Sequence, residues 1–444
     1  MGYIVFFNSV KSKEIINSPY NVRLDSMADR VVRGKILDSE GNVLAETIVA
    51  EDGSEKRRYP YGDLYAHVVG YDSHGKSGLE STENFNLLSS HAFFIERLVN
   101  TVQEKKNVGD DVVTTLNTNL QKAAYNALGY YNGAVVVMEA STGKILAMVS
   151  KPTYDPNRIN KEWEYLTTSD KSELLNRATQ GMYAPGSVFK IITALEYIRE
   201  NKDYDNYSYE CTSEIHYEDT TIHCAKNTTH GVEDLKTAFA NSCNTAFSDI
   251  GLSLDIADYR STAEDLLFNS KLPSVLPYSQ SKFVLDKKSE SSEIMMTAMG
   301  QGKTQVSPYH MTLISAAIAN GGVLMEPYLV DEIVNYTGAI VSKNYPDSYK
   351  RIMSSAEATQ LKEYMTEVVT SGTGYSLAGE SYTVAGKTGT AEYSSDKNKS
   401  HSWFTGFSNV DNPELVITVI VEGADKSGMS AVTVAKKVLN AYYY

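Results

Sequence analysis

The sequence predicts an α+β protein, in which an antiparallel sheet is packed by helices and follows a smaller N-terminal domain of mixed structure. Two observations lead to this fold class. The chain has 444 residues, which is too long for one ordinary hydrophobic core. Strand-like segments stand at both ends of the C-terminal region and enclose mostly helical sequence, so the first and last segments should meet in one sheet. We expect domains at residues 1–120 and 121–444.

The N-terminal region is rich in loops. Residues 31–47 contain two apolar runs around the turn sequence Glu40-Gly41-Asn42, which predicts a β-hairpin. Residues 85–103 have apolar positions at helical spacing. The polar run at residues 107–111 marks the approach to the domain boundary, and a helix is expected at residues 120–128.

The C-terminal region begins and ends with strands. Residues 133–138 and 145–149 are apolar runs joined by the turn sequence Ser141-Thr-Gly143, which predicts a second hairpin. Residues 415–421 form a continuous apolar run, typical of a buried strand. After this run, four residues have the spacing of an apolar helix face: Ala431, Val434, Ala435 and Val438.

A serine and a lysine lie one helical turn apart in Ser187-Val-Phe-Lys190. The preceding Ala184-Pro185-Gly186 is a turn sequence, and an apolar helical pattern follows, so Ser187 is expected at a helix N-terminus. The helix dipole and the free N–H groups there favour developing negative charge. Lys190 should share a helix face with Ser187, and partial burial favours a neutral amine that can serve as a base.

Two further motifs can complete an acyl-transfer site. They are Ser242-Cys-Asn244 and Lys387-Thr-Gly-Thr390, the second in a strand-like stretch. Each motif alone has an ordinary explanation. Ser187 can be a helix N-cap, Lys190 a solvated charge, and the other two motifs polar helix positions and a strand end. The three motifs together favour a serine acyltransferase.

The three motifs resemble the signature of the penicillin-binding proteins and serine β-lactamases, which is Ser-x-x-Lys, Ser-x-Asn and Lys-Thr-Gly. Trp403-Phe-Thr-Gly406, Gly300-Gln-Gly302 and Asn320-Gly-Gly322 are similar to segments of the family's transpeptidase domain. Arg33-Gly34 and Gly75-x-x-Gly78-x-Glu80 resemble the non-catalytic domain of class B penicillin-binding proteins. The resemblance implies a five-stranded antiparallel sheet packed by helices, with an N-terminal pedestal domain.

The resemblance also gives three charged residues of the N-terminal region a structural role. Arg33, Arg58 and Glu80 are similar to family positions and are expected to form an ion-pair network that braces the junction between the domains. The alternative is three unrelated surface charges, which contribute little to stability.

The chemistry that the resemblance implies is serine acyl transfer on peptidoglycan stem peptides. Ser187 would attack the carbonyl of a D-Ala-D-Ala stem, Lys190 would accept its proton, and the terminal D-alanine would leave. The backbone N–H groups of Ser187 and Thr390 would form an oxyanion hole. The amine of a second stem would then take the acyl group and form a cross-link. β-Lactams mimic the donor and would acylate the same serine.

The remaining motif residues would handle the donor stem. Ser242 would relay a proton to the leaving amine, Asn244 would bind the donor amide, and Lys387 would raise the local positive potential. Substrate binding falls to three consecutive residues, Thr388, Gly389 and Thr390. The two hydroxyls among them suit a terminal carboxylate.

All three cysteines lie within a short region: Cys211, Cys224 and Cys243. His230 lies between the last two, and a Cys₃His set is an ordinary tetrahedral zinc site. Some class B penicillin-binding proteins have a metal site in this region. A Cys211–Cys224 disulfide with a remaining free thiol is the alternative. Two more histidines, His216 and His223, compete as ligands but fit solvated loop positions better.

Composition limits the partners and the location of the protein. The net charge of −14 argues against nucleic acid. Residues 3–7 are apolar but too short to span a bilayer. The resemblance implies that they are the stub of an N-terminal anchor that holds the protein at the extracytoplasmic face of the bacterial cell membrane, and an N-terminal strand is the alternative. It also implies a separate glycosyltransferase partner, and no cofactor for the chemistry itself.

Three functional classes are compatible with the sequence. The first is a D,D-transpeptidase. The second is a D,D-carboxypeptidase or β-lactamase-like hydrolase, and the third is a non-catalytic β-lactam sensor or scaffold. The N-terminal domain favours the transpeptidase, because β-lactamases are normally compact single domains. A scaffold would not need the complete set of motif residues, and the sequence identifies no glutamate as a base for hydrolysing the acyl-enzyme.

Overall fold

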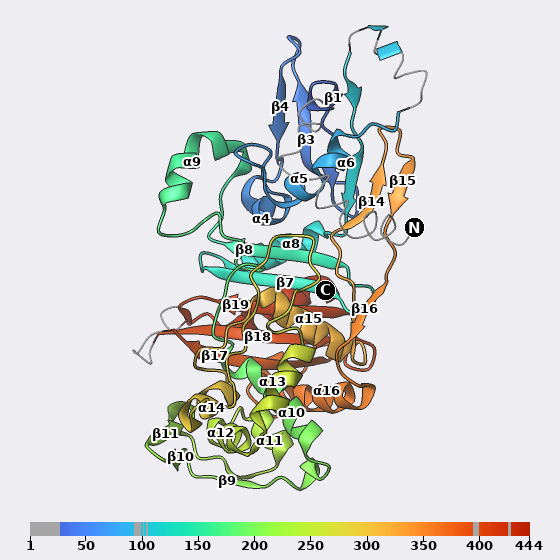
Figure 1. The fold of residues 1–444 in the computed structure, drawn as a ribbon. Coiled ribbons are helices and arrows are strands. Elements are labelled where there is room, and N and C mark those ends of the chain that lie inside the picture. The colour runs from blue at the N-terminus through green and yellow to red at the C-terminus, as the bar shows by residue number, and fades with distance from the viewer. Residues whose placement is uncertain (1–26, 93–98, 101, 104, 394–398, 425–427) are drawn as a thin grey trace.

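A computed structural model describes the chain except residues 1–26, 93–98, 101, 104, 394–398 and 425–427 (Figure 1). The apolar stretch at residues 3–7 and part of the predicted helix at 85–103 therefore lie outside the described residues. Within the described part of 85–103, α6 (Asn84–Leu88) covers the first predicted positions, residues 89–92 are not helical, and residues 99, 100 and 102 are helical again. None of the helices described is both long and apolar enough to cross a membrane.

A five-stranded antiparallel sheet forms the centre of the molecule (Figure 1). Its order is β17 (Val384–Glu392), β18 (Ser400–Ser408), β19 (Leu415–Val421), β7 (Gly133–Glu139) and β8 (Ile145–Lys151). The hairpin β7–β8 and the strand β19 confirm the predictions for these segments. Because β19 pairs with β7 along its whole length, the first and last strands of the C-terminal region do meet in one sheet.

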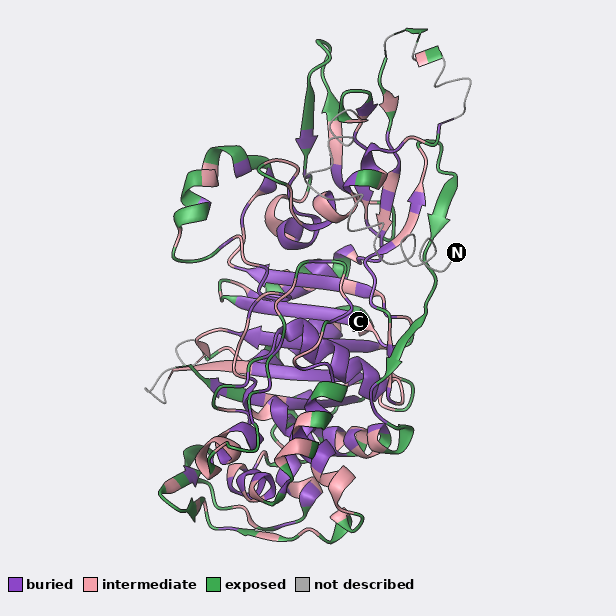
Figure 2. Ribbon diagram, in the orientation of Figure 1, coloured by how far each residue is buried: buried purple, intermediate pink, exposed green. Residues whose placement is uncertain are grey.

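Both faces of this sheet are covered by helices, as the alternation along β7 shows. Val135 and Val137 face a core shared with α8 (Thr118–Leu128) and α17 (Ala431–Tyr443). Val136 and Met138 face the opposite core, which includes residues of α15 (Pro308–Ala319) and α10 (Lys190–Glu200). The strand is apolar from Gly133 to Met138 because both of its faces are buried there (Figure 2). The four apolar positions predicted on α17 are all buried.

A group of helices and short strands lies beyond the β17 edge of the sheet (Figure 1). Its helices are α10, α11 (Leu235–Ala240), α12 (Asn244–Ser253), α13 (Ile256–Asp265), α14 (Ser291–Ala298) and α16 (Ser355–Thr370). Its strands are β9 (Tyr209–Cys211), β10 (Glu214–Tyr217), β11 (Thr220–His223) and β12 (Gly231–Glu233). The helix α9 (Ile159–Thr168) stands apart from this group, beside the N-terminal region.

The N-terminal region contains a six-stranded sheet made from two distant parts of the chain. Its order is β15 (Ile340–Lys343), β14 (Val330–Val334), β6 (Asp111–Thr114), β2 (Ile36–Leu37), β3 (Val43–Val49) and β4 (Glu55–Arg58). The antiparallel pair β2–β3 confirms the predicted hairpin. The smaller elements around it are β1 (Val31–Val32), β5 (Asn107–Val108), α4 (Ala66–Val69) and α5 (Gly78–Thr82). The strands β13 (Val323–Met325) and β16 (Ser348–Arg351) form a separate antiparallel pair, and β13 contacts α15.

A buried carboxylate organises this N-terminal region. Glu80, on α5, is fully buried and receives hydrogen bonds from Arg33 Nε at 2.6 Å and Arg57 Nε at 2.7 Å. Burial raises the pKa of the Glu80 carboxyl, but the two guanidinium groups outweigh burial and hold that pKa below its usual value. The network therefore joins β4, α5 and the segment before β2 within the N-terminal region.

The sequence prediction for this network was right for Arg33 and Glu80 and wrong for Arg58. Arg58 is exposed and pairs with Glu46 on the neighbouring strand. Successive residues of a strand point to opposite faces, so the residue before Arg58 reaches Glu80 instead. The network lies inside the N-terminal region, and its described contacts do not brace the junction between the domains.

Replacing Glu80 by Gln should lower the free energy of unfolding by about 3–5 kcal/mol, because two buried guanidinium groups would lose their counter-charge. Glu46→Gln is the matched control, since it removes the partner of an exposed arginine and should cost at most about 1 kcal/mol. Urea denaturation measures both values. Equal losses for the two variants would contradict this account of the N-terminal region.

Two histidines are buried as neutral imidazoles. His67 Nε2 donates to the backbone oxygen of Glu173 at 2.8 Å, and His310 Nε2 donates to that of Leu266 at 2.7 Å. Burial lowers the pKa of both imidazoles to about 4. An unfolded histidine has a pKa of about 6.5, so the unfolded chain binds more protons than the folded chain between these values.

The free energy of unfolding should therefore fall as the pH falls from about 6.5 towards 4, by up to about 1.4 kcal/mol per pH unit for each imidazole. Denaturation at pH 7.5 and pH 5 measures the loss, which His67→Gln should reduce. His216→Gln, at an exposed histidine, is the control and should leave the loss unchanged. If His67→Gln is as acid-sensitive as the unmodified protein, buried His67 is not a source of the effect.

Candidate active site

The turn that carries Ser187 is in close contact with two other segments, at Gly300 and at Thr390. Ser187 lies in a 3₁₀ turn, η4 (Gly186–Phe189), which leads directly into α10, so the predicted position at a helix start is formed. Gly186 has a φ of +56°, and its N–H donates to Gly300 O at 2.8 Å. A Cβ on Gly186 would lie 2.4 Å from Thr390 O. The serine turn and the strand β17 are therefore in backbone contact.

Two further contacts fix the same turn. The indole Nε1 of Trp403, on β18, donates to Ala184 O at 3.2 Å. Gly389 leaves room for Val188, because a Cβ on this glycine would lie 3.1 Å from Val188 Cγ1 and 3.2 Å from Val188 N. The side chain of Ser187 is half-buried at this junction. The Lys-Thr-Gly strand thus contributes its glycine to the packing of the serine turn.

Lys190 is completely buried and points at the second motif. Its Nζ donates to Ser242 O at 2.6 Å and to Asn244 Oδ1 at 2.9 Å, and lies 3.3 Å from Ser242 Oγ. Burial lowers the pKa of the Lys190 amine to about 8, although the nearby cysteines and Glu233 oppose this shift. The structure therefore brings Lys190, Ser242 and Asn244 together, as the sequence predicts.

Ser242 occupies a position that glycine usually takes. Its φ is +57°, and it follows the C-cap residue of α11. The N–H of Ser242 donates to Phe239 O, and the N–H of Cys243 donates to Ala238 O, which is the hydrogen-bond pattern of a Schellman motif. A left-handed backbone costs a serine of order 1–2 kcal/mol. This conformation places Ser242 and Asn244 on the side of Lys190.

Lys387, the fourth residue of β17, is also fully buried. Its Nζ donates to Thr388 O at 3.1 Å and lies 5.5 Å from the centre of the Phe239 ring. Burial, and next the positive charge of Lys190, lower the pKa of the Lys387 amine well below its usual value. The two amines are therefore close enough to influence each other, while the hydroxyls of Thr388 and Thr390 lie towards solvent.

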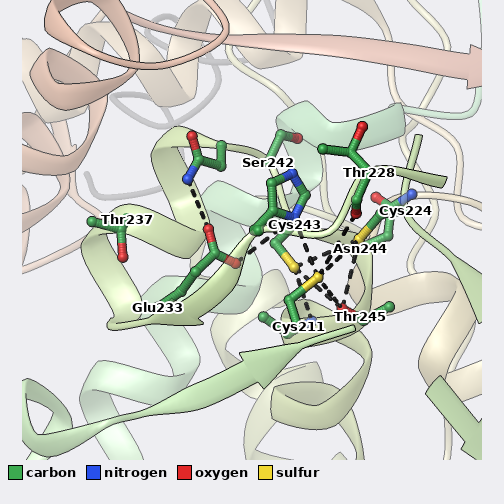
Figure 3. A network of polar contacts seen from close by, with 12 residues as sticks. Cys211, Cys224, Thr228, Glu233, Thr237, Ser242, Cys243, Asn244 and Thr245 are labelled. Atoms are coloured by element: carbon green, nitrogen blue, oxygen red, sulfur yellow. Dashed lines mark hydrogen bonds and ion pairs between the residues drawn. The ribbon is translucent and has the colours of Figure 1, made fainter. Parts of the chain in front are cut away.

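The cysteines and His230 form one buried cluster beside the second motif (Figure 3). Their four ligand atoms lie within 4.8 Å of one another, and the three cysteines are free thiols. The sulfur–sulfur distance is 3.7 Å from Cys211 to Cys224 and 3.6 Å from Cys224 to Cys243. Cys211 Sγ is 3.3 Å from His230 Nδ1.

These separations fit a tetrahedral zinc ion. Bond lengths of about 2.3 Å to sulfur and 2.0 Å to nitrogen place two sulfur ligands about 3.8 Å apart, and a sulfur and a nitrogen about 3.5 Å apart. The hydrogen bond between Cys224 and Cys243 lowers the pKa of the Cys224 thiol and raises that of Cys243, so Cys224 is the thiol of this pair that more readily gives the thiolate form that binds metal. The other two candidate ligands are not in the cluster, because His216 and His223 contact Glu214 at the surface.

Two residues of this region were not singled out from the sequence. Glu233 is buried beside the cluster: its Oε1 accepts from Asn241 Nδ2 at 2.8 Å, and its Oε2 lies 3.9 Å from His230 Nδ1 (Figure 3). Thr373 lies next to β17, where its Oγ1 is 2.6 Å from Thr388 Oγ1. The pair of glycines around Thr373 is the signal that sequence analysis could have used.

Known proteins match this chain over most of its length. Residues 133–441 match the family described as the penicillin binding protein transpeptidase domain, and residues 33–112 match the penicillin binding protein A dimerisation domain. The peptidoglycan D,D-transpeptidase PbpA of Mycolicibacterium smegmatis is 32% identical over 424 residues, which cover 89% of this chain and 84% of the relative.

Solved structures of penicillin-binding proteins also match the fold of this chain. The imipenem acyl-enzyme complex of penicillin-binding protein A from M. tuberculosis has a TM-score of 0.85 and 29% identity, covering 94% of this chain and 100% of that one. The D,D-transpeptidase domain of a peptidoglycan glycosyltransferase from Eggerthella lenta has a TM-score of 0.83 and 31% identity, covering 93% of this chain and 98% of that one.

Proposed function

Because this chain belongs to the penicillin-binding protein transpeptidases, we propose that Ser187 is the nucleophile with which it cross-links peptidoglycan stem peptides. The protein is a D,D-transpeptidase of class B type, and β-lactams acylate it. The observation that carries the residue assignment is the buried amine of Lys190, which begins the helix after Ser187 and contacts both Ser242 and Asn244. This arrangement joins two motifs around one proton acceptor.

The first step is proton transfer from Ser187 to Lys190. A buried amine with a pKa of about 8 is partly neutral at physiological pH and has a lone pair for the hydroxyl proton. The serine oxygen then attacks the carbonyl of the penultimate D-alanine in the donor stem. Negative charge develops on that carbonyl oxygen, and the N–H groups of Ser187 and Thr390 are the proposed donors to it. The backbone contact between the serine turn and β17 supports this pairing.

The second step is loss of the terminal D-alanine. Ser242 Oγ lies 3.3 Å from Lys190 Nζ, so a proton can pass from the amine through this hydroxyl to the leaving nitrogen. The acyl group remains on Ser187 until the amine of a second stem attacks it. Asn244 is the proposed partner of the donor amide, and its Oδ1 also accepts from Lys190.

Recognition of the donor carboxylate is assigned to β17. Thr388, Gly389 and Thr390 are the proposed substrate-binding residues, since the two hydroxyls can donate to a carboxylate and the glycine leaves the strand close to the serine turn. Lys387 is buried beneath them and contributes positive potential when it is protonated. None of these steps requires a cofactor.

We also propose that Cys211, Cys224, His230 and Cys243 hold a structural zinc ion. The metal would fix four segments at once, because the ligands come from β9, from the residues after β11, from the residues before β12 and from the N-cap of α12. Cys243 stands between Ser242 and Asn244, so the same ligand set fixes the position of the second motif. The zinc ion would have a structural role and not a catalytic one, as expected for a closed site with four protein ligands.

A division into domains at residues 1–120 and 121–444 is supported by the separate family matches at 33–112 and 133–441. The relatives are cell-wall synthesis enzymes, which act outside the cytoplasm. An N-terminal membrane anchor and a glycosyltransferase partner that supplies the glycan strands are proposed from the same relationship.

A labelled penicillin should acylate Ser187 with one label per chain, and the adduct should persist because no group of the proposed set activates water. Intact mass measured over time and peptide mapping test this assignment. The Ser187→Ala variant is the negative control. An adduct on another residue would exclude Ser187 as nucleophile, and rapid release of hydrolysed penicillin would instead identify a hydrolase.

In the same assay, Lys190→Ala should acylate at least about 100-fold more slowly, because the hydroxyl loses its proton acceptor. Lys202→Ala, at an exposed lysine just beyond α10, is the matched control and should react normally. Melting temperatures show whether each variant is folded. Acylation at the unmodified rate by a folded Lys190→Ala protein would assign the base to another group.

The protein purified without chelator should contain about one zinc ion per chain. A chelator should lower its melting temperature, because binding of metal to the folded chain stabilises it. Cys243→Ala should lose most of the metal, whereas His216→Ala, at a histidine outside the cluster, should retain it. A metal-free protein with a mass two hydrogens below that of the reduced chain would identify the disulfide instead.

A further inference from the structure

Thr373 places a hydroxyl directly beside a proposed substrate-binding hydroxyl. It follows α16, and its Oγ1 lies 2.6 Å from the Oγ1 of Thr388 on β17. Thr373 is exposed and Thr388 is half-exposed, so a ligand can reach this pair of residues. Nothing in the proposed mechanism so far uses this residue.

The backbone around Thr373 is held in place from both sides. Its N–H donates to Ala240 O, at the end of α11, at 3.2 Å. A Cβ on Gly372 would lie 2.3 Å from the same Ala240 oxygen, and the N–H of Gly374 donates to Val368 O at 2.8 Å. The two glycines thus let the chain approach α11 closely, and the position of Thr373 relative to the second motif is fixed.

The direction of the hydrogen bond between the two threonines follows from what each can donate. A threonine hydroxyl has one proton to donate and can also accept. If Thr388 donates its proton to a carboxylate, the short contact to Thr373 requires Thr373 to be the donor. The other acceptor near Thr373 Oγ1 is Ala240 O, at the longer distance of 3.5 Å. When a carboxylate is bound, Thr373 therefore donates a hydrogen bond to Thr388, and Thr388 donates one to the carboxylate.

We propose that Thr373 is a positioning residue for the carboxylate of the donor stem, acting through Thr388. This inference rests on the proposed acyl transfer at Ser187. Its hydroxyl orients the proton of Thr388 towards the anion and polarises that bond, because hydrogen bonds to charged groups are stronger than neutral ones. The ligand it serves is a carboxylate, either that of a D-alanine or that of a β-lactam.

The test compares benzylpenicillin with its methyl ester, which differ in the carboxylate charge. Thr373→Val should lower the second-order rate of acylation by benzylpenicillin about tenfold, the expected effect of one lost hydrogen bond. The rate with the methyl ester, low from the start, should be unchanged by this substitution. Thr373→Ser keeps the hydroxyl and should restore the rate with benzylpenicillin.

Two comparisons separate positioning from packing. Thr366→Val removes a hydroxyl of α16 that donates only to its own helix, and it should leave both rates unchanged. Adding Thr373→Val to Thr388→Val should cause no further loss with benzylpenicillin, because Thr373 acts through Thr388. Melting temperatures are measured for all variants, and Thr373→Ala replaces Thr373→Val if the valine does not fold.

Equal losses with benzylpenicillin and with the ester would overturn the inference, since a packing defect would slow both. Unchanged rates in Thr373→Val would overturn it as well. The absence of any adduct on Ser187 in the unmodified protein would instead refute the proposed function, and this result is distinct from the two outcomes above.

Discussion

The buried amine of Lys190 is the interaction on which the arrangement of the site depends. It lies at the start of α10 and reaches the turn between α11 and α12, where it is bound by the carbonyl oxygen of Ser242 and the amide oxygen of Asn244. A buried amine without such acceptors would be strongly unfavourable, so the two helical segments can pack only in the position that satisfies it. The nucleophile and the second motif are thereby fixed relative to each other.

The third motif is positioned in another way, by close approach of backbones. Gly186, Gly300 and Gly389 each lie where a side chain would collide with a neighbouring segment. The strand β17 therefore contacts the serine turn closely, with its backbone at Gly186 and through the side chain of Val188 at Gly389. A site held by one buried amine and three glycines is rigid before any ligand binds, which is what stabilisation of a developing oxyanion requires.

Much of this could be predicted from the sequence, because the informative signals are local. The strands β7, β8 and β19 and the helix α17 follow from apolar runs and helical spacing, and the three motifs identify the site. The sequence analysis failed where a residue's partner depends on contacts between segments that are distant in the sequence. The partner of Glu80 is Arg57 and not Arg58, because the register of β4 against β3 decides which arginine faces inward. Likewise, the proposed role of Thr373 depends on its contact with Thr388 on β17, which the local sequence around Thr373 does not indicate.

The six-stranded sheet has a consequence for how the chain matures. Its strands β2, β3, β4 and β6 are complete at Thr114, whereas β14, which pairs with β6, begins only at Val330. A ribosome delivers the N-terminus first, so β6 keeps an open edge until most of the enzyme has been synthesised. Open edges invite pairing with other chains. Nascent copies of this protein therefore carry an unpaired edge on β6 during synthesis, and a fragment cut near residue 120 would keep the same open edge permanently.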